Sequence, residues 1–77
     1  MMLQLSAHVR RRMSERGVRL RDIEHALANY ISSWPTPEGS IQYIGPSPEG
    51  RDLKVWLVAP GLSEPRPIVK STAWKDT

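Results

Sequence analysis

The chain has 77 residues, a net charge of +3, 39% hydrophobic residues and no cysteine, which suits one small domain over residues 1–77. The absence of cysteine excludes disulfides and thiolate metal sites, and no apolar run reaches the roughly 18 residues of a membrane span. Its start lacks a basic stretch followed by an apolar one, so we expect a soluble, cytoplasmic protein with no membrane partner.

The positive charge is concentrated near the start of the chain. Residues 8–21 hold six arginines and one acid, a net +5, whereas the rest of the chain carries −2. Arginine pairs bidentately with phosphate or carboxylate groups. This segment is therefore an exposed solubilising surface, a nucleic-acid contact or a docking surface for an acidic partner.

A first helix is predicted over residues 6–16, with Ser6 as its N-cap and Gly17 as the residue that ends it. Val9 and Met13, four residues apart, form a narrow apolar stripe that we expect to face the core. Beside this stripe, at the same spacing, lie three polar side chains that we call the polar row: His8, Arg12 and Arg16.

The polar row has two interpretations. In the structural one, His8 is half-buried and hydrogen-bonded, while the two arginines pair with Asp22 or Glu24 of the next helix. In the catalytic one, a histidine and nearby cations supply the proton transfer and charge stabilisation that RNA cleavage by a 2′-hydroxyl requires. The second histidine, His25, is expected to face solvent without a role.

A second helix is predicted over residues 20–31, where apolar residues recur at helical spacing and acids occupy the first turn. Two prolines in residues 32–39 favour a loop, after which the apolar period changes to two. Three strands follow, over residues 40–44, 51–59 and 68–74, and a further short strand is allowed at Leu3–Leu5. The expected fold is α+β, with two N-terminal helices packed on one face of a three-stranded antiparallel sheet.

The two faces of the predicted sheet differ in chemistry. One face of the strand at 51–59 is purely apolar and must meet the helices, whereas the other carries Lys54 and Trp56. Period two also places Lys70 and Trp74 on one face of the last strand. If both pairs share a side, they form a surface suited to single-stranded RNA, because bases stack on aromatic rings and phosphates meet ammonium groups. The alternative is a surface that closes a homodimer or binds a partner peptide.

The sequence contains no signature of a metal or nucleotide cofactor. No cluster of histidine, cysteine or carboxylate residues has metal-ligand spacing, and neither a glycine-rich nucleotide motif nor a nucleophile elbow occurs. We therefore expect no metal and no cofactor. The small core without phenylalanine, together with tryptophans on the strands, predicts a homodimer or a complex with a partner protein.

Several of these residues recur in one recognisable pattern. The first helix contains Ser6-x-His8-x-x-x-Arg12-Met13-x-x-Arg16-Gly17-Val18, and the second contains Asp22-Ile23-x-x-Ala26-Leu27. The strands add Gly50-Arg51-x-Leu53-x-Val55 and Ile68-Val69-x-x-Thr72. Together these runs resemble the bacterial family called domain of unknown function 4258, over nearly the whole chain. One departure is Lys70-Ser71, where that family is usually more apolar.

The resemblance implies a class of activity and a set of positions. The family is similar to the BrnT and RelE-like toxins of type II toxin–antitoxin modules, which are small α+β ribonucleases that use no metal and are neutralised by an antitoxin. It implies a RelE/BrnT-like fold for this chain. It also marks the polar positions of the family as His8, Arg12, Arg16 and Arg51.

Two hypotheses result. In the leading one, the chain is a toxin-like, metal-independent endoribonuclease whose partners are RNA and an antitoxin, with His8 as general acid or base. The residues that contact the scissile phosphate are then Arg12, Arg16 and Arg51, and those that hold the RNA are Lys54, Trp56 and Lys70. In the alternative, the chain is a non-catalytic protein-binding module in which the histidine and the arginines form a structural network.

Overall fold

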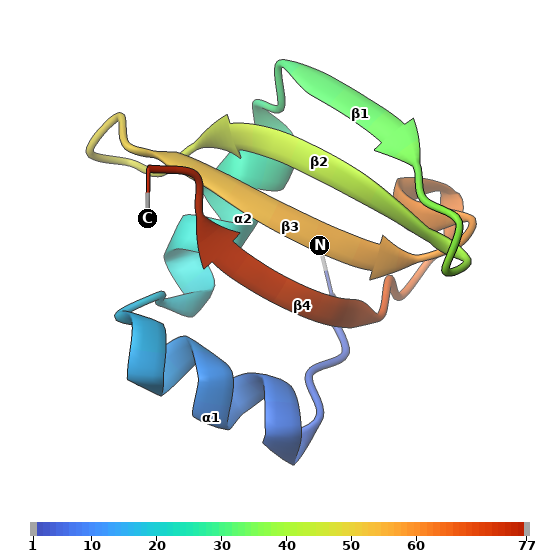
Figure 1. The fold of residues 1–77 in the computed structure, drawn as a ribbon, viewed down its shortest axis with the longest axis horizontal. Coiled ribbons are helices and arrows are strands. Elements are labelled where there is room, and N and C mark those ends of the chain that lie inside the picture. Colours follow the sequence, from blue (N-terminus) through green and yellow to red (C-terminus); the bar gives the residue numbers. More distant parts are fainter. Residues whose placement is uncertain (1, 77) are drawn as a thin grey trace.

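The computed structural model describes residues 2–76, which form two helices followed by four strands (Figure 1). The elements are α1 (Ala7–Arg16), α2 (Leu20–Ala28), β1 (Ser32–Pro35), β2 (Ser40–Pro46), β3 (Asp52–Val58), the 3₁₀ turn η1 (Gly61–Ser63) and β4 (Val69–Trp74). The strands form one sheet in the order β1-β2-β3-β4, and all neighbours are antiparallel. The predicted α+β class is confirmed.

The sheet has four strands where the sequence predicts three. β1 occupies a segment that its prolines assign to a loop, and it pairs with β2 so that Trp34 lies opposite Gln42. The residue before a proline prefers extended backbone, and proline is tolerated on an edge strand because one side of that strand needs no donor. Both conditions hold at Trp34 and Pro35, so these prolines do not prevent a strand.

α2 ends three residues earlier than the predicted helix over residues 20–31. The Asn29 N–H and its side-chain Nδ2 both donate to the His25 carbonyl, at 3.1 and 3.0 Å. The Ile31 N–H then donates to the Ile44 carbonyl of β2 at 2.8 Å. The chain therefore leaves the helix where the backbone donor of Ile31 bonds to the sheet instead of to α2.

The N-terminal segment forms a single bridge instead of the short strand allowed at Leu3–Leu5. Gln4 pairs with Ile68 in a parallel bridge, outside the named strands. The Gln4 N–H donates to the Pro67 carbonyl at 2.8 Å, and the Val69 N–H donates to the Gln4 carbonyl at 3.0 Å. These two bonds attach the segment before α1 to the start of β4.

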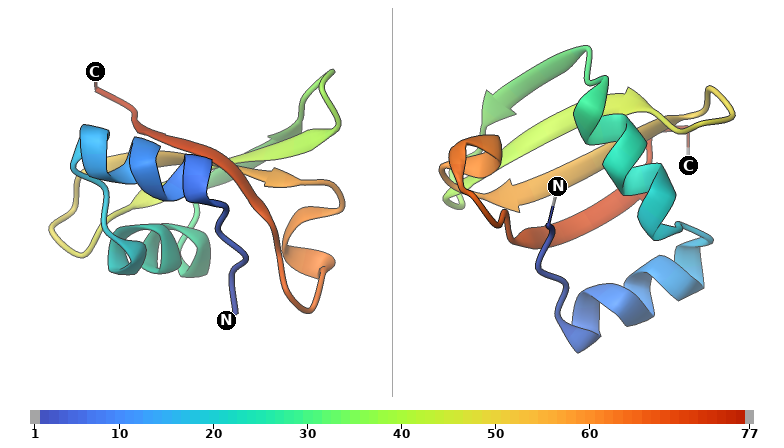
Figure 2. Two further views of the ribbon diagram at one scale, coloured as in Figure 1. Left: turned by 90° about the horizontal axis from the view of Figure 1, so that it is seen from below. Right: turned by 180° about the vertical axis from the view of Figure 1, so that it is seen from behind.

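The two helices take different positions around the sheet. α2 lies behind β2 and β3, whereas α1 lies alongside β4 at the edge of the sheet (Figures 1 and 2). The sequence predicts both helices on one face, but only α2 covers that face centrally. α2 approaches β2 closely at Gly45, where a β-carbon would collide with the Ala26 carbonyl. No helix within the described range is long and apolar enough to cross a membrane.

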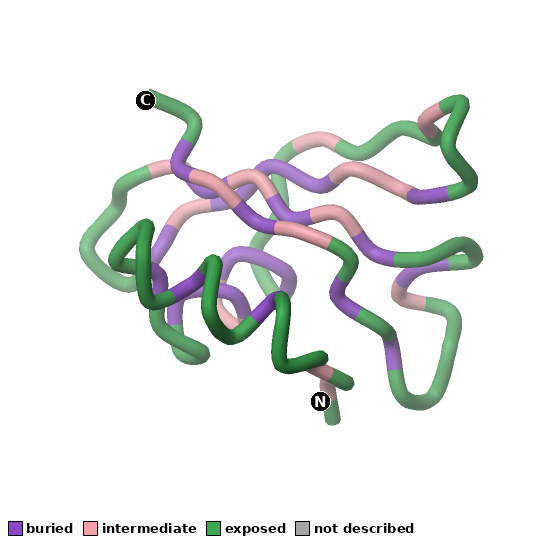
Figure 3. The backbone as a smooth tube through the Cα atoms, turned by 60° about the horizontal axis from the view of Figure 1, so that its bottom comes forward, coloured by how far each residue is buried: buried purple, intermediate pink, exposed green. Residues whose placement is uncertain are grey.

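The hydrophobic core lies between the sheet and the helices (Figure 3). Leu53, Val55 and Leu57 are completely buried, as the apolar face of β3 predicts. Val9 and Met13 of α1 are buried against the same cluster. The core therefore uses one face of the sheet only.

We call the other sheet face the open face, because no helix of the described chain covers it. The side chains that strand register places there include Trp34, Gln42, Lys54, Trp56 and Ser71, together with the apolar Ile44, Val58 and Ala73. Of these, Trp34 is 42% exposed. The open face thus combines polar, aromatic and a few aliphatic side chains, on the side of the sheet away from α2.

Candidate nucleic-acid interface

His8 is positioned by a helix that is capped at both ends. The Ser6 hydroxyl accepts the Val9 N–H at 3.1 Å, and Gly17 ends α1 in the left-handed conformation at φ 66°. Because Val9 and Met13 face the core, the polar row turns outward and His8 is exposed. In the described chain His8 makes no hydrogen bond or ion pair. The prediction that it is half-buried and hydrogen-bonded is wrong, and the imidazole is accessible to a ligand.

The two arginines of the polar row have different surroundings. The Arg12 Nη1 lies 4.0 Å from the Glu15 Oε1, with both side chains about half exposed, so this ion pair contributes little stability. The Arg16 Nη1 donates to the Thr72 carbonyl of β4 at 2.7 Å. Within the described residues neither arginine reaches the α2 acids that the structural interpretation predicts as partners. Arg16 fastens α1 to the sheet edge, while Arg12 can turn toward a ligand.

Arg51 precedes β3 and contacts the C-terminal end of β4. Its Nη2 lies 2.9 Å from the Asp76 Oδ1, and its guanidinium carbon lies 4.2 Å from the centre of the Trp74 ring. The hydrogen bond from Arg51 holds the pKa of the Asp76 carboxyl below its ordinary value. The Trp74 Nε1 donates to the Arg16 carbonyl at 2.8 Å. Arg16 and Arg51 therefore both contact one buried tryptophan.

The structure thus divides the four residues that the resemblance marks as polar positions. Arg16 and Arg51 gather around Trp74, at the C-terminal end of α1. His8 lies two turns earlier, about 12 Å from Arg16 along the helix axis at 1.5 Å per residue. Arg12 lies between them on the same helix. One phosphate group cannot reach all four side chains, but an extended strand lying along α1 would pass them in turn.

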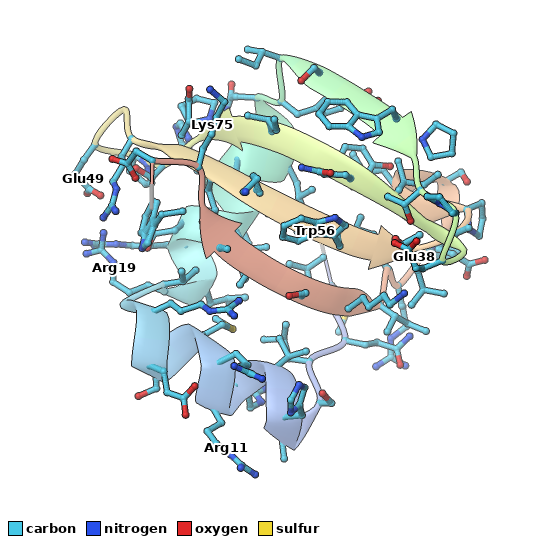
Figure 4. The ribbon with its side chains drawn as sticks, in the orientation of Figure 1. Arg11, Arg19, Glu38, Glu49, Trp56 and Lys75 are labelled. Atoms are coloured by element: carbon cyan, nitrogen blue, oxygen red, sulfur yellow. The ribbon has the colours of Figure 1, made fainter. Side chains whose placement is uncertain are left out.

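A row of side chains crosses all four strands of the open face. Trp34 lies opposite Gln42, Gln42 opposite Trp56, and Trp56 opposite Ser71. The Lys54 Nζ lies 5.7 Å from the centre of the Trp56 ring. Figure 4 shows the Trp56 ring over β3, on the side away from α2. Sequence reasoning missed Trp34, because the prolines that follow it favour a loop over a strand. The available signal was that a residue before proline prefers extended backbone, which is compatible with a strand.

β4 does not follow the predicted alternation. Its register with β3 shifts between Trp56 and Leu57, so β4 accommodates one additional residue at Lys70. Lys70 is exposed and lies beside Trp56 on the open face. The side chains of β4 that are buried on the opposite face are Val69, Thr72 and Trp74. The prediction that Lys70 and Trp74 share a face of this strand is therefore wrong: Lys70 lies beside Trp56, whereas Trp74 is buried on the opposite face.

A hollow of about 170 Å³ opens on the open face. It is lined by Glu38, Ser40, Trp56, Lys70 and Ser71. The Lys70 Nζ donates to the Glu38 carbonyl at 3.2 Å, which holds the turn after β1 against β4. The buried Ser40 hydroxyl lies 2.6 Å from the Thr36 Oγ1. We call this feature the Trp56 hollow.

The positive charge of residues 8–21 is available only in part. The Arg19 Nη2 lies 2.7 Å from the Glu49 Oε1, and the Arg21 Nη2 lies 3.8 Å from the Glu49 Oε2. Arg10 and Arg11, in contrast, pair with no acid in the part of the chain described, and Arg11 points away from the sheet (Figure 4). The attraction for anions is therefore concentrated on α1.

Neither a metal site in the described part of the chain nor a matching protein identifies a function for this chain. Among the described residues, no group of three or more histidine, cysteine, aspartate or glutamate side chains could hold a metal ion. Comparison with family models, with curated proteins and with solved structures finds no match for this chain. A function must therefore be inferred from the side chains themselves.

Proposed function

We propose that the chain is a toxin-like, metal-independent endoribonuclease that binds RNA on the open face and cleaves it on α1. The observation that carries this proposal is the exposure of His8, which has no partner in the described chain and stands on a helix rich in arginine. An accessible imidazole can accept or donate a proton. His8 would take the proton of the attacking 2′-hydroxyl or deliver one to the leaving oxygen.

The arginines would stabilise the negative charge that develops on the scissile phosphate. Arg12 is the best placed, because its contact with Glu15 is long and exposed. Arg16 gives one N–H to the Thr72 carbonyl, and Arg51 engages Asp76 while remaining 44% exposed. A guanidinium carries five N–H donors, so both retain donors for a phosphate.

The arrangement of the elements supports a continuous RNA path. On the open face, Trp34 and Trp56 would stack on bases while Lys54 and Lys70 meet phosphates. α1 lies alongside β4, so a strand that crosses the sheet from β1 to β4 next encounters the polar row (Figure 1). Binding and cleavage would thus use adjacent surfaces.

The resemblance to domain of unknown function 4258, and through it to BrnT and RelE-like toxins, supports the same assignment. It adds an antitoxin protein as the partner, a RelE/BrnT-like fold and a place in the bacterial cytoplasm, and we include all three in the proposal. A homodimer is the second form of assembly that the small core favours.

A non-catalytic protein-binding module is the second candidate. One observation favours it: Arg16 and Arg51 already have structural partners around Trp74. Exposed apolar side chains around β1 would also suit a protein partner, since Ile31 is 71% and Tyr30 is 45% exposed. In this case the chain would have no ribonuclease activity.

Two histidine variants separate these candidates. The purified chain is incubated with single-stranded RNA in the presence of a chelator, and the same chain is expressed alone to monitor bacterial growth. We expect wild type to cleave RNA and arrest growth. His8→Gln should lower the cleavage rate about 10²–10⁴-fold with an unchanged melting temperature, because His8 has no partner to lose.

His25→Gln is the matched control. The His25 Nδ1 lies 2.8 Å from the Pro46 carbonyl, so this change should lower stability and leave the cleavage rate of the folded chain unaltered. Absence of cleavage by the wild type, or full activity in a folded His8→Gln chain, would exclude His8 catalysis and leave the protein-binding module.

A further inference from the structure

We propose that the Trp56 hollow binds one unpaired RNA base and prefers a base that carries an exocyclic amino group. This inference rests on the proposed binding of RNA to the open face, but it does not require cleavage. The Trp56 ring supplies a surface on which any base can stack. Ser40, Ser71, Lys70 and Glu38 surround it with hydrogen-bonding groups.

The size of the hollow limits the occupant to a small planar group. Pockets for drug-sized molecules have volumes of about 300–1,000 Å³, whereas this hollow has about 170 Å³. A single base can enter such a space. A base within a duplex cannot enter, because neighbouring base pairs cover both of its faces. The RNA must therefore be unpaired at this position.

The charges around the hollow favour a base over a phosphate. Lys70 is the one cation of the lining, and its Nζ already donates to the Glu38 carbonyl at 3.2 Å. Glu38 brings a carboxylate to the same lining, and Figure 4 shows Glu38 and Trp56 at the same end of the open face. A carboxylate repels phosphate oxygens, so the backbone would pass outside the hollow, near Lys54.

Glu38 also determines which base fits. An ionised carboxylate only accepts hydrogen bonds, and the N4 amino group of cytosine is a donor that glutamate recognises. Uracil presents a carbonyl oxygen at the same position, which the carboxylate repels. Lys70 can donate to the ring nitrogen or carbonyl of the base, and the Ser71 hydroxyl can donate or accept. Cytosine therefore matches the lining, whereas uracil opposes it.

A pair of short oligonucleotides tests this inference without any cleavage. The probes are 5′-fluorescein-labelled, 2′-O-methyl pentanucleotides, one of five uridines and one with a central cytidine. Their blocked 2′-hydroxyls prevent cleavage by 2′-hydroxyl attack, so a failure of the ribonuclease proposal leaves the measurement intact. Fluorescence anisotropy at one fixed salt concentration gives both dissociation constants for the full chain.

We expect the cytidine probe to bind roughly tenfold more tightly than the uridine probe. Trp56→Ala should weaken both probes, by about tenfold, because the stacking surface is lost. Glu38→Gln should abolish the preference while binding persists. Its control is Glu64→Gln, an exposed acid that does not line the hollow, which should keep the preference. Equal affinities for the two probes, or an unchanged preference in Glu38→Gln, would overturn the inference even if the chain cleaves RNA.

Discussion

Replacing Asp22 by asparagine should destabilise the fold, because this carboxylate is completely buried at the first turn of α2. It accepts three hydrogen bonds, all from Arg19: the backbone N–H at 2.8 Å, Nε at 3.1 Å and Nη2 at 3.1 Å. The first of these is half of a capping box, which satisfies a helix donor that has no partner inside α2. Asp22 thus joins the start of α2 to the turn that follows α1.

The size of the stability loss depends on which hydrogen bonds the asparagine side chain can still make. Its single oxygen can still accept the Arg19 backbone N–H, but its amide NH₂ faces the guanidinium and the charged bonds are lost. Hydrogen bonds to charged groups contribute about 1.5–3 kcal/mol. Arg19 is half exposed and regains water when its partner is removed, so the loss should fall short of that for a pair buried at both ends. We expect about 2–3 kcal/mol, or roughly 10–20 °C in melting temperature for a chain of this size.

The same contact has a defined pH dependence. Burial raises the pKa of the Asp22 carboxyl, but the hydrogen bonds and the charge of Arg19 outweigh burial and hold this pKa below its ordinary value. A group with a lowered pKa in the folded state stabilises the fold above the unfolded pKa, which is about 3.9. That contribution is lost as the pH falls through the folded pKa. The difference in unfolding free energy between wild type and Asp22→Asn should therefore have its largest value at pH 7 and decrease below about pH 4.

Urea unfolding followed by circular dichroism at pH 7 and pH 3 measures both effects. Glu24→Gln is the matched control, since Glu24 is on the same helix and pairs with no group in the described residues; it should change stability by less than about 0.5 kcal/mol. An Asp22→Asn chain as stable as wild type at pH 7, or a difference that is the same at both pH values, would refute this reasoning.

Two further substitutions test the packing of each helix. Gly45→Ala should cost about 3 kcal/mol or more, because its β-carbon would meet backbone atoms of Ala26 and Tyr30 and force α2 away from β2; a wild-type melting temperature would contradict this close approach. Arg16→Ala should cost about 1–3 kcal/mol by removing the donor to the Thr72 carbonyl. Arg12→Ala, its control on the same helix, should cost under about 0.5 kcal/mol because its ion pair is exposed, and equal losses in the two variants would show that the Thr72 contact is unimportant.

Local signals were sufficient for α1 and β3. The hydroxyl of Ser6 and the left-handed Gly17 act within one helical turn, so nearby residues are sufficient to predict both ends of α1. The alternation of β3 likewise places Lys54 and Trp56 away from the core, as predicted. In these two elements the side-chain direction follows from the regular repeat of the helix or strand, which neighbouring residues are sufficient to indicate.

Prediction from the sequence failed where a local hydrogen-bond partner competes with one that is distant in the sequence. The residues after α2 have helical spacing, but the Ile31 N–H bonds to the Ile44 carbonyl and the chain turns into β1. On β4, the register shift beside Trp56 breaks period two, so Lys70 lies on the open face while Trp74 is buried on the other. A bulge depends on the partner strand, which the alternation of a single strand does not contain.

In the candidate site, too, some features could be predicted from the sequence and others depend on the tertiary structure. The spacing of His8, Arg12 and Arg16 on one side of a helix could be read from the sequence alone, as could the concentration of arginine around them. Tertiary structure decided what each side chain does there, because it brings Thr72, 56 residues away in sequence, to Arg16 and leaves His8 without a partner in the described chain. The spacing of residues along one helix determines the direction in which their side chains point. A hydrogen bond also needs a second group within about 3 Å, and here only the packing of distant segments supplies that group.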